Sequence, residues 1–487
     1  MKNKIFYFAF IPFLILSCNS NNGNNGNTDP IDNNDYYIKE DVKISFLCMA
    51  NQKYLDKLQS MIDEFEQMEP HVKVNLYNPL GSGNYTMLEK LIVSGFFKEN
   101  YPDISQCYPD NVVKYIAKGY AINLDDYLNN DEYGIFTEGN DYITSFMDEG
   151  KGYALPGTYS LPFCKSTELM YYNADALIGL DLHQQDATIN NGNPLDEDYL
   201  DNLTWDELFD KLCPAIKGYN DAQDDNHKIM SVDESSSIFT YDSDENFFIT
   251  LANQYGYGYT SVNELGEGSI DFDNDGMRTL VKKLKVAKDN KYLQTRGSYL
   301  DYVSELFLNR KALFTVSSTA GLSYNYNEND PFKIGVARIP RADGGSYSAI
   351  NQGPSVCILD HKDENRSLAS YLLWKHITSK ENSSDWALFT GYMGIRNSSY
   401  QTEEYQKALD VTGVTDLKQI ATSDNLKKIA EVRSDTFNTP VFRGSGNTRT
   451  IVGRLLKECL LSSGADEDIN QLFENALIDA ESYLPKN

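Results

Sequence analysis

A strand, a helix and a second strand follow one another near the start of the chain, and this order constrains the fold more than any other feature. The segment Val42 to Cys48 is apolar and rich in β-branched residues, which is typical of a buried strand. Between Lys53 and Met68 apolar residues recur at helical spacing, and Glu69-Pro70 ends this helix. The alternation from Val72 to Tyr77 predicts a second strand. Together they predict a βαβ unit with parallel strands and a right-handed crossover.

The same alternation of strands and helices continues through the first 150 residues, which predicts the α/β fold class. From Arg366 to the end the pattern is mostly helical. Thr204 and Glu207 form a capping box that opens a helix through Leu212. The other expected elements are helices at Tyr85–Phe97, Asn111–Lys118, Met277–Lys288 and Tyr299–Phe307, and strands at Asp103–Tyr108, Ala312–Val316 and Lys333–Ile339.

The length and the charge of the chain limit its organisation and its partners. With 487 residues the chain is too long for a single hydrophobic core, so two lobes are expected. The formal net charge is -28. A body this acidic argues against binding nucleic acid or an anionic membrane surface, and it disfavours a strongly anionic ligand.

The N-terminal segment has the layout of a secretory signal peptide. Two lysines precede the apolar run Ile5–Leu16, which is too short to span a bilayer. Cys18 follows at the expected cleavage site and resembles the cysteine of a bacterial lipobox. We therefore expect residues 1–17 to be a signal peptide, Cys18 to carry palmitate, and the Asn- and Gly-rich residues 18–40 to be a flexible tether. A plain cleaved signal is the alternative, and either one places the mature protein outside the cytoplasmic membrane.

No pattern in the sequence predicts a metal ion or another cofactor. The loop Asp271–Gly276 matches the first half of an EF-hand, but Lys282 occupies the position where a bidentate glutamate is needed. We interpret this loop as an acidic turn that caps the helix beginning at Met277. Apart from Cys18, the cysteines are scattered without metal-binding spacing and are interpreted mostly as small buried apolar residues; they are Cys48, Cys107, Cys164, Cys213, Cys357 and Cys459.

The sequence also lacks the motifs of common hydrolases and nucleotide-binding enzymes. We find no GxSxG, HExxH, P-loop or strand-linked GxGxxG. The five histidines are isolated, and with 71 Asp and Glu residues no carboxylate pair can be singled out for glycoside hydrolysis. The chain is therefore predicted not to be an enzyme, and a surface glycosidase stays open as a lesser alternative. Tyrosine is abundant, at 34 residues against 3 Trp, and its amphipathic ring suits stacking on sugars.

Several short stretches, in a fixed order, resemble family 1 extracellular solute-binding proteins, the sugar-binding lipoproteins of ABC importers. Each stretch is weak alone, but their order and spacing extend over nearly the whole chain after the tether. The stretches are Leu55–Phe65, Glu69–Val74, Tyr101–Ile104, Tyr115–Gly119, Leu124–Tyr127, Tyr153–Pro156, Met170–Asn173, Leu203–Leu208, Lys311–Phe314, Ile334–Pro340, Trp374–Ser379 and Thr390–Tyr392.

The resemblance implies a two-lobed, periplasmic-binding-protein-like clamshell of type II, with a hinge of two or three crossing segments. The first α/β lobe is expected to contain residues 41–155 and 311–360, and the second residues 156–310 and 361–487. The first crossing is accordingly expected near Tyr153–Pro156, and the other crossings at the ends of the segment 311–360.

The resemblance further implies a monomeric protein, on the outer face of the cytoplasmic membrane or in the periplasm, that delivers a solute to an ABC permease. The expected solute is a carbohydrate, with an oligosaccharide as the favoured class, and no chemistry or cofactor is involved. A non-sugar solute such as a glycerophosphodiester or a peptide is the alternative. Arg396 and Arg443 keep this alternative open, because a phosphate needs converging arginines or backbone N–H groups.

Candidate ligand-binding residues are implied by position in the same family. Loops at the carboxyl ends of strands are expected to face the cleft, and Asp110 is expected to hydrogen-bond sugar hydroxyls. Related proteins often have a Trp where this chain has Cys107 and Tyr108. For Arg443, a ligand clamp and a salt-bridge partner are equally open. The candidates on the first lobe and hinge are Asn51, Gln52, Ser82, Tyr85, Tyr108, Asp110, Asn111, Ser318, Thr319, Gln352 and Gly353, and those on the second lobe are Tyr159, Tyr241, Tyr392, Arg396, Phe442 and Arg443.

Overall fold

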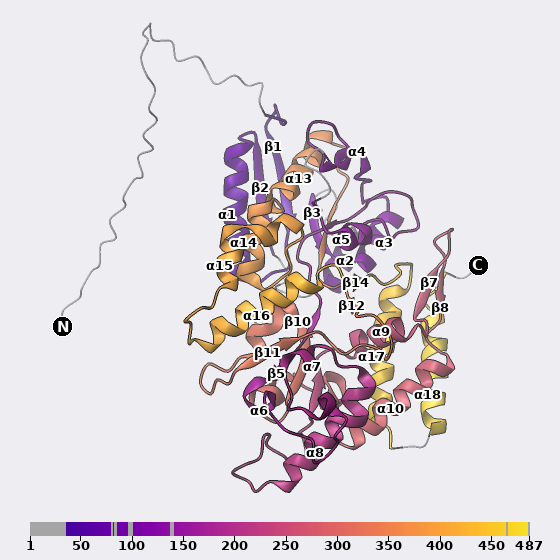
Figure 1. The fold of residues 1–487 in the computed structure, drawn as a ribbon. Helices are drawn as coiled ribbons and strands as arrows, with labels where there is room; N and C mark the ends of the chain where they lie inside the picture. The colour runs from indigo at the N-terminus through magenta and orange to yellow at the C-terminus, as the bar shows by residue number, and fades with distance from the viewer. Residues whose placement is uncertain are drawn as a thin grey trace, which may run out of the picture.

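The chain folds into two lobes, each built around a five-stranded sheet, as the computed structural model shows (Figure 1). The structure describes residues 36–78, 81, 85–95, 101–136, 141–463 and 466–485. The predicted signal peptide and most of the predicted tether, with Cys18, lie outside the described residues. Within these residues, none of the helices combines the length and apolar composition that a membrane crossing requires.

The first sheet has the strand order β2-β1-β3-β13-β4. Strands β1 and β2 pair in parallel from Val42 opposite Val72 to Leu47 opposite Tyr77, and helix α1 connects them. The predicted βαβ unit is therefore confirmed. The bounds are Val42–Leu47 for β1, Gln52–Met68 for α1, Val72–Tyr77 for β2, Ile104–Cys107 for β3, Leu161–Pro162 for β4 and Ser355–Ile358 for β13.

Helices cover both faces of the first sheet, and the alternation of β1 decides which side chains meet them. Phe46 packs with α1 and α13 in one cluster, whereas Leu47 packs with α2 and α3 on the other side. The helices of this lobe are α2 Tyr85–Val93, α3 Pro109–Ala117, α4 Asp125–Leu128, α5 Thr144–Glu149, α13 Glu364–Ile377, α14 Lys380–Thr390, η6 Asn397–Gln401 and α15 Glu403–Leu409.

The second sheet has the order β11-β5-β10-β6-β9 and corrects the expected lobe boundaries. Strands β10 and β11 both pair antiparallel with β5, so the segment 311–360 does not belong wholly to the first lobe. Its apolar residues fit either sheet, and long-range pairing decides between them. The bounds are Glu168–Asn173 for β5, Phe239–Tyr241 for β6, Leu293–Thr295 for β9, Phe314–Ser318 for β10 and Ile334–Ala337 for β11.

Helices also surround the second sheet, and the predicted capping box begins one of them. Thr204 Oγ1 accepts a hydrogen bond from Glu207 N at 3.1 Å, ahead of a π-helical turn. The predicted helix Tyr299–Phe307 is wrong, because the chain breaks at Leu300 into two short helices, α11 and α12. The elements are α6 Ala174–Leu177, η3 Ile189–Gly192, α7 Glu197–Asp201, η4 Glu207–Leu212, α8 Cys213–Ala222, α9 Asp244–Tyr255, β7 Thr260–Val262, β8 Gly268–Ile270, α10 Asp275–Asp289, α11 Arg296–Tyr299, α12 Ser304–Leu308, η5 Thr319–Asn325, α17 Ser445–Leu461 and α18 Asp466–Glu481.

Three chain segments connect the lobes side by side. Ser166 and Gln352 exchange backbone hydrogen bonds of 3.0 and 2.8 Å, and Asn351 N donates to Phe437 O at 2.8 Å. The first crossing thus lies between β4 and β5, later than Tyr153–Pro156. The chain returns to the first sheet between β12 and β13, and α13 and α14 still pack on the first lobe. The remaining bounds are β12 Ala349–Ile350, α16 Leu417–Val432 and β14 Thr436–Phe437.

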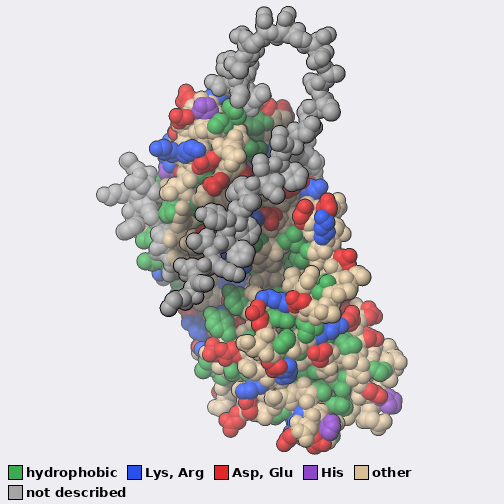
Figure 2. Space-filling view, turned by 90° about the vertical axis from the view of Figure 1, so that its left-hand side faces the viewer, with side chains coloured by type: hydrophobic (Ala, Val, Ile, Leu, Met, Phe, Trp, Pro, Cys, Tyr) green, Lys and Arg blue, Asp and Glu red, His purple; other side chains and the backbone are tan. Residues whose placement is uncertain are grey.

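The surface carries charges of both signs. Figure 2 shows acidic side chains spread over the second lobe, which is the lower part of that view, with basic side chains between them. On this face, charges of both signs are therefore interspersed over the second lobe.

Candidate functional site

A cavity of about 570 Å³ lies between the lobes, and the hinge forms its back. The first lobe contributes the N-terminal ends of α2 and α3, and the second lobe contributes the ends of β6 and β10 and the start of α17. Asn351, Gln352 and Gly353 of the hinge also line it. The size is that of a small-molecule site, and polar groups line much of the cavity.

Two tyrosines form the aromatic part of the first-lobe wall. The rings of Tyr85 and Tyr108 meet edge to face, with centroids 4.8 Å apart. Loss of water around its hydroxyl raises the pKa of Tyr108 to about 12, so this group stays a neutral donor. Asn111 fixes the loop by accepting from Tyr108 N at 2.8 Å and donating to Glu89 at 2.9 Å. The wall therefore offers ring faces and hydroxyl groups in a fixed arrangement.

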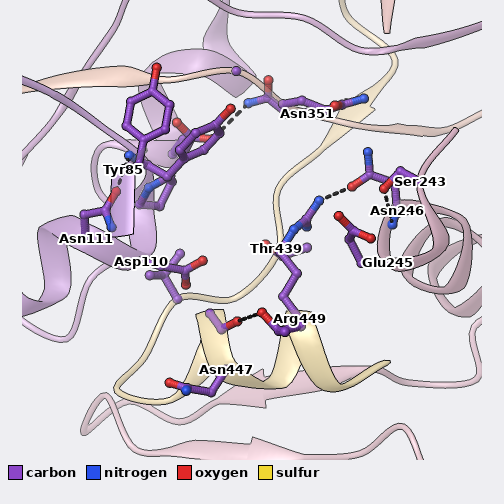
Figure 3. Close-up of a pocket in the computed structure, with 18 of the residues that line it drawn as sticks. Tyr85, Asp110, Asn111, Ser243, Glu245, Asn246, Asn351, Thr439, Asn447 and Arg449 are labelled. Atoms are coloured by element: carbon purple, nitrogen blue, oxygen red, sulfur yellow. Dashed lines mark hydrogen bonds between the residues drawn. The ribbon is translucent and has the colours of Figure 1, made fainter. Parts of the chain in front are cut away.

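A chain of hydrogen bonds forms the second-lobe wall. Arg449 of α17 donates to the Asn246 side-chain oxygen, and Asn246 Nδ2 donates to Glu168 Oε1 at 2.8 Å. The Tyr241 hydroxyl donates to the other carboxylate oxygen, Glu168 Oε2. Burial raises the pKa of Glu168 to about 7, against the lowering effect of these two donors. The guanidinium of Arg449 is thus oriented within the cavity, between Asp110 and Glu245 (Figure 3).

One hydrogen bond crosses from wall to wall. The Ser445 hydroxyl, in the first turn of α17, donates to Asp110 of the first lobe. A Cβ on Gly446 would lie 3.1 Å from the Asp110 carboxyl carbon, so the carboxylate sits directly against this helix start. Burial raises the pKa of Asp110, and the Ser445 bond and Arg449 oppose that rise. Asp110 is therefore in the cleft as predicted, with its carboxylate at the N-terminus of a helix.

A buried ion pair holds the hinge behind the cavity. Lys165 is 0% exposed and donates to Glu149, which is 7% exposed, and to Gly353 O at 3.0 Å. Ser355 Oγ donates to Glu149 at 2.8 Å and Asn351 Nδ2 at 3.4 Å, so with Lys165 the carboxylate is satisfied by three donors from two hinge segments. A buried charge requires such compensation. Gly353 has φ 86°, and a Cβ there would overlap the carbonyl of Cys164, so only glycine fits.

The structure brings nine of the seventeen predicted ligand-binding residues to the cavity. They come from both lobes and the hinge, which agrees with a cleft between lobes. Whether they contact a ligand stays a prediction. The nine are Tyr85, Tyr108, Asp110, Asn111, Ser318, Gln352, Gly353, Phe442 and Arg443.

The other predicted residues lie elsewhere, for identifiable reasons. Arg396 is buried in the first lobe, where it donates to Thr378 O at 2.6 Å and Tyr142 at 2.7 Å. Asn51 caps α1, and Tyr241 supports Glu168 beneath the cavity. Ser82 lies outside the described residues. Gln52 bonds Asp56, Thr319 is buried, and Tyr159 and Tyr392 pack in first-lobe clusters and not on the second lobe.

Several cavity residues were missed from the sequence. Asp242 and Glu245 follow Tyr241 at the carboxyl end of β6, a position where α/β sheets bind ligands, so this signal was present. Glu149, Glu168 and Arg449 carried no local signal, because long-range packing brings them to the cavity.

No metal site emerges from the described residues. Three or more His, Cys, Asp or Glu side chains nowhere gather there in a metal-binding group. The acidic loop caps a helix, as predicted: Asn274 accepts from Met277 N at 2.9 Å, and Asp273 pairs with Arg278 at 2.6 Å. The six cysteines of the described chain are free and buried, which confirms their interpretation as small core residues.

Comparison with known proteins agrees with this geometry. The family model for bacterial extracellular solute-binding proteins matches residues 60–413. The sn-glycerol-3-phosphate-binding periplasmic protein UgpB of Pectobacterium atrosepticum is 24% identical over 365 residues, 72% of each chain. UgpB of Escherichia coli K12 is 23% identical over 364 residues, 72% of this chain and 73% of the relative.

Solved structures show the same fold. UgpB of Mycobacterium tuberculosis in complex with glycerophosphocholine superposes with a TM-score of 0.66 at 17% identity, covering 91% of this chain and 98% of that one. The sugar-binding protein MalE of Xanthomonas citri gives 0.66 at 14% identity, with the same coverage. At these identities the likeness concerns the fold alone.

Two α/β lobes around a hinged, polar cleft define a clamshell binding protein for a small solute. The chain belongs to the bacterial extracellular solute-binding protein family. Its class is thereby that of the solute-binding protein of an ABC importer, which works outside the cytoplasm and whose family members bind solutes rather than transform them.

Proposed function

We propose that this protein captures a neutral oligosaccharide in the cleft and delivers it to an ABC permease without chemical change. The charge pattern of the cavity carries the proposal, because it lacks an excess of cations. The carboxylates belong to Glu89, Asp110, Glu149, Glu168, Asp242 and Glu245, and the cations to Lys114, Arg296, Arg443 and Arg449.

These charges of both signs are interleaved, and two of the carboxylates are paired with lysines. Lys114 donates to Glu89 at 2.7 Å, and Lys165 compensates Glu149. A phosphate dianion entering the cavity would meet carboxylates on both walls, and like charges at short range are unfavourable. Sugar hydroxyls both donate and accept, so they can pair with either sign of charge.

The aromatic wall supports the same class of solute. The edge-to-face pair of Tyr85 and Tyr108 exposes a ring surface beside neutral hydroxyls. The apolar face of a sugar ring can pack on such a surface while its hydroxyls reach the polar wall opposite.

The most evident anion site in the cleft, the N-terminus of α17, is occupied by a carboxylate of the protein itself. The start of α17 would favour a phosphate, but the Asp110 carboxylate lies against it and bonds Ser445. An anionic solute would have to displace this side chain, whereas a hydroxyl could join it.

A glycerophosphodiester is the second candidate. Arg449, with its guanidinium oriented into the cavity, could hold a phosphodiester, and tyrosines with carboxylates could hold a quaternary ammonium group. The relatives named for sn-glycerol 3-phosphate, and the one solved with glycerophosphocholine, favour this candidate. Other fold neighbours are named for maltose or cycloalternan.

A calorimetric panel tests the proposal. It would contain linear α- and β-linked oligosaccharides, sn-glycerol 3-phosphate and glycerophosphocholine. Binding of an oligosaccharide with micromolar or tighter affinity, and at least about tenfold preference over both phosphates, would support it. Binding of a phosphate alone would replace it with the second candidate.

The lipid anchor is a further part of the proposal. Residues 1–17 would be removed, Cys18 would carry palmitate, and residues 18–36 would tether a monomer near the permease. The predicted tether is shortened from residue 40, because Ile38 is fully buried and its backbone N–H donates to Glu69 at 3.4 Å. Labelling with radioactive palmitate should mark the wild-type protein and not the Cys18→Ser variant. Equal labelling of both proteins would refute the anchor.

A further inference from the structure

A second cavity adjoins the cleft on the second lobe. Its volume is about 460 Å³, and it shares Asp242, Ser243, Glu245 and Arg296 with the main cavity. From this junction it continues to Tyr302. The two cavities therefore meet at these four residues.

Asp242 stands at the junction with unused hydrogen-bonding capacity. It follows β6, and within the described residues its carboxylate accepts no hydrogen bond, while one of its oxygens is buried. Burial raises the pKa of Asp242 to about 6, and Arg296 opposes that rise. An unpaired, partly buried carboxylate gains from any donor that enters the cavity.

Arg296 supplies donors on the other side of the junction. Its guanidinium lies 4.3 Å from the ring centroid of Tyr302, a cation–π contact, and forms no hydrogen bond or ion pair with the described residues. Stacking of this kind fixes the plane of the guanidinium while its N–H groups stay free. Tyr302 is 54% exposed, so the ring also presents surface to the groove.

The loop that carries Arg296 is held in place by its neighbours. Asp244 accepts from Thr295 Oγ1 at 2.6 Å and from Gly297 N at 2.6 Å, on either side of Arg296. Thr295 and Ser298 cap each other at the start of α11. The backbone that carries Arg296 is therefore fixed next to the junction, which lowers the entropic penalty of binding.

We propose that this second cavity is a subsite for a neutral saccharide unit at the end of a chain that projects from the cleft. The inference rests on the proposed function. Asp242 and Glu245 would accept from sugar hydroxyls, Arg296 would donate to them, and Tyr302 would pack against the ring. Carboxylates outnumber cations in this cavity, with Asp244 and Asp301 beside the two shared acids against Arg296 and Lys457, so an anionic group fits it poorly.

All residues of the subsite belong to the second lobe. The projecting unit can therefore bind before the lobes close and stay bound afterwards. A preference for longer chains follows, because the added unit gains contacts without changing those in the cleft.

Calorimetry with two chain-length series tests the subsite. The purified protein is titrated with linear α-1,4-glucans from maltose to maltoheptaose and β-1,4-glucans from cellobiose to cellohexaose. In the series that binds, one added unit should tighten binding at least about tenfold. The variant Tyr302→Ala should erase this gain and leave the shorter ligand within about twofold, because Tyr302 lines the second cavity and not the main one.

Matched variants test whether a lost length preference results from the missing Tyr302 ring or from general destabilisation of the protein. Tyr324→Ala removes a tyrosine that is 73% exposed and lines neither cavity, so the length gain should persist. Tyr302→Phe keeps the ring and should also retain it. A length gain unchanged in Tyr302→Ala would overturn the subsite alone. Absence of binding with every glucan would overturn the proposed function, and the subsite with it.

Discussion

The two walls of the cleft differ in what they offer a solute. The first-lobe wall presents the rings of Tyr85 and Tyr108 at the starts of α2 and α3, and Asn111 holds the backbone at Tyr108. The second-lobe wall presents Arg449, Asn246 and Glu168, joined in one hydrogen-bond chain. The first-lobe wall thus supplies an aromatic packing surface, and the second-lobe wall supplies hydrogen-bonding groups that orient the solute. A solute that needs both is held only when the two walls face each other.

The hinge sets that relation, so the largest effect is expected from breaking its ion pair. Lys165→Met leaves the Glu149 carboxylate buried without its cation. We expect the free energy of unfolding to fall by about 3–5 kcal/mol, measured by urea unfolding. Lys407→Met removes a lysine from an exposed pair with Glu403 and should leave the urea midpoint unchanged. A wild-type midpoint for Lys165→Met would contradict the role of the pair.

The second-lobe wall should also make stability depend on pH. Burial raises the pKa of Glu168 from 4.5 to about 7, so the folded state binds its proton more tightly than the unfolded state. This contribution is full below pH 4.5 and is lost as the pH rises through about 7. Relative to Glu168→Gln, the wild type should lose up to about 3 kcal/mol across this range in urea unfolding. A difference independent of pH would contradict the assignment.

Removing the Arg449 guanidinium from the second-lobe wall should weaken solute binding strongly. Arg449→Ala deletes a guanidinium and leaves Asn246 and Asp110 without its charge. We expect the tightest oligosaccharide to bind about a hundredfold more weakly in calorimetry. Arg454→Ala, on the same helix but paired with Asp479 at the surface, should bind as the wild type does. Equal affinities for Arg449→Ala and Arg454→Ala would show that Arg449 does not contribute to solute binding.

Removing an aromatic ring from the first-lobe wall should reduce solute affinity by a smaller factor. Tyr108→Ala deletes one ring of the edge-to-face pair, and we expect a loss of about tenfold in affinity. Tyr108→Phe keeps the ring and should lose less. If Tyr108→Ala weakened binding more than Arg449→Ala, the expected order of the two walls would be wrong, because aromatic packing would then contribute more to affinity than the hydrogen bonds of Arg449.

The two walls also differ in how far the sequence predicts them. Tyr85, Tyr108, Asp110 and Asn111 lie at the starts of helices next to strands in sequence, so the family resemblance could be carried over to them position by position. The first βαβ unit was found from the local spacing of its apolar residues.

The second wall is assembled from distant segments. Glu168, Asn246 and Arg449 meet only because β5, α9 and α17 pack together, and no local pattern encodes that packing. The same limit explains the lobe boundaries. The sequence of β10 reads as a strand, but its pairing with β5, more than 140 residues earlier, decides its lobe.

Hydrogen exchange tests most directly whether both walls close on one solute. With the tightest oligosaccharide of the panel bound, backbone amides at the start of α3 and in the first turns of α17 should both become more protected than in the free protein. Saturation with sn-glycerol 3-phosphate should protect neither. Protection of one wall alone, or of both walls by the phosphate and not by the sugar, would contradict the account.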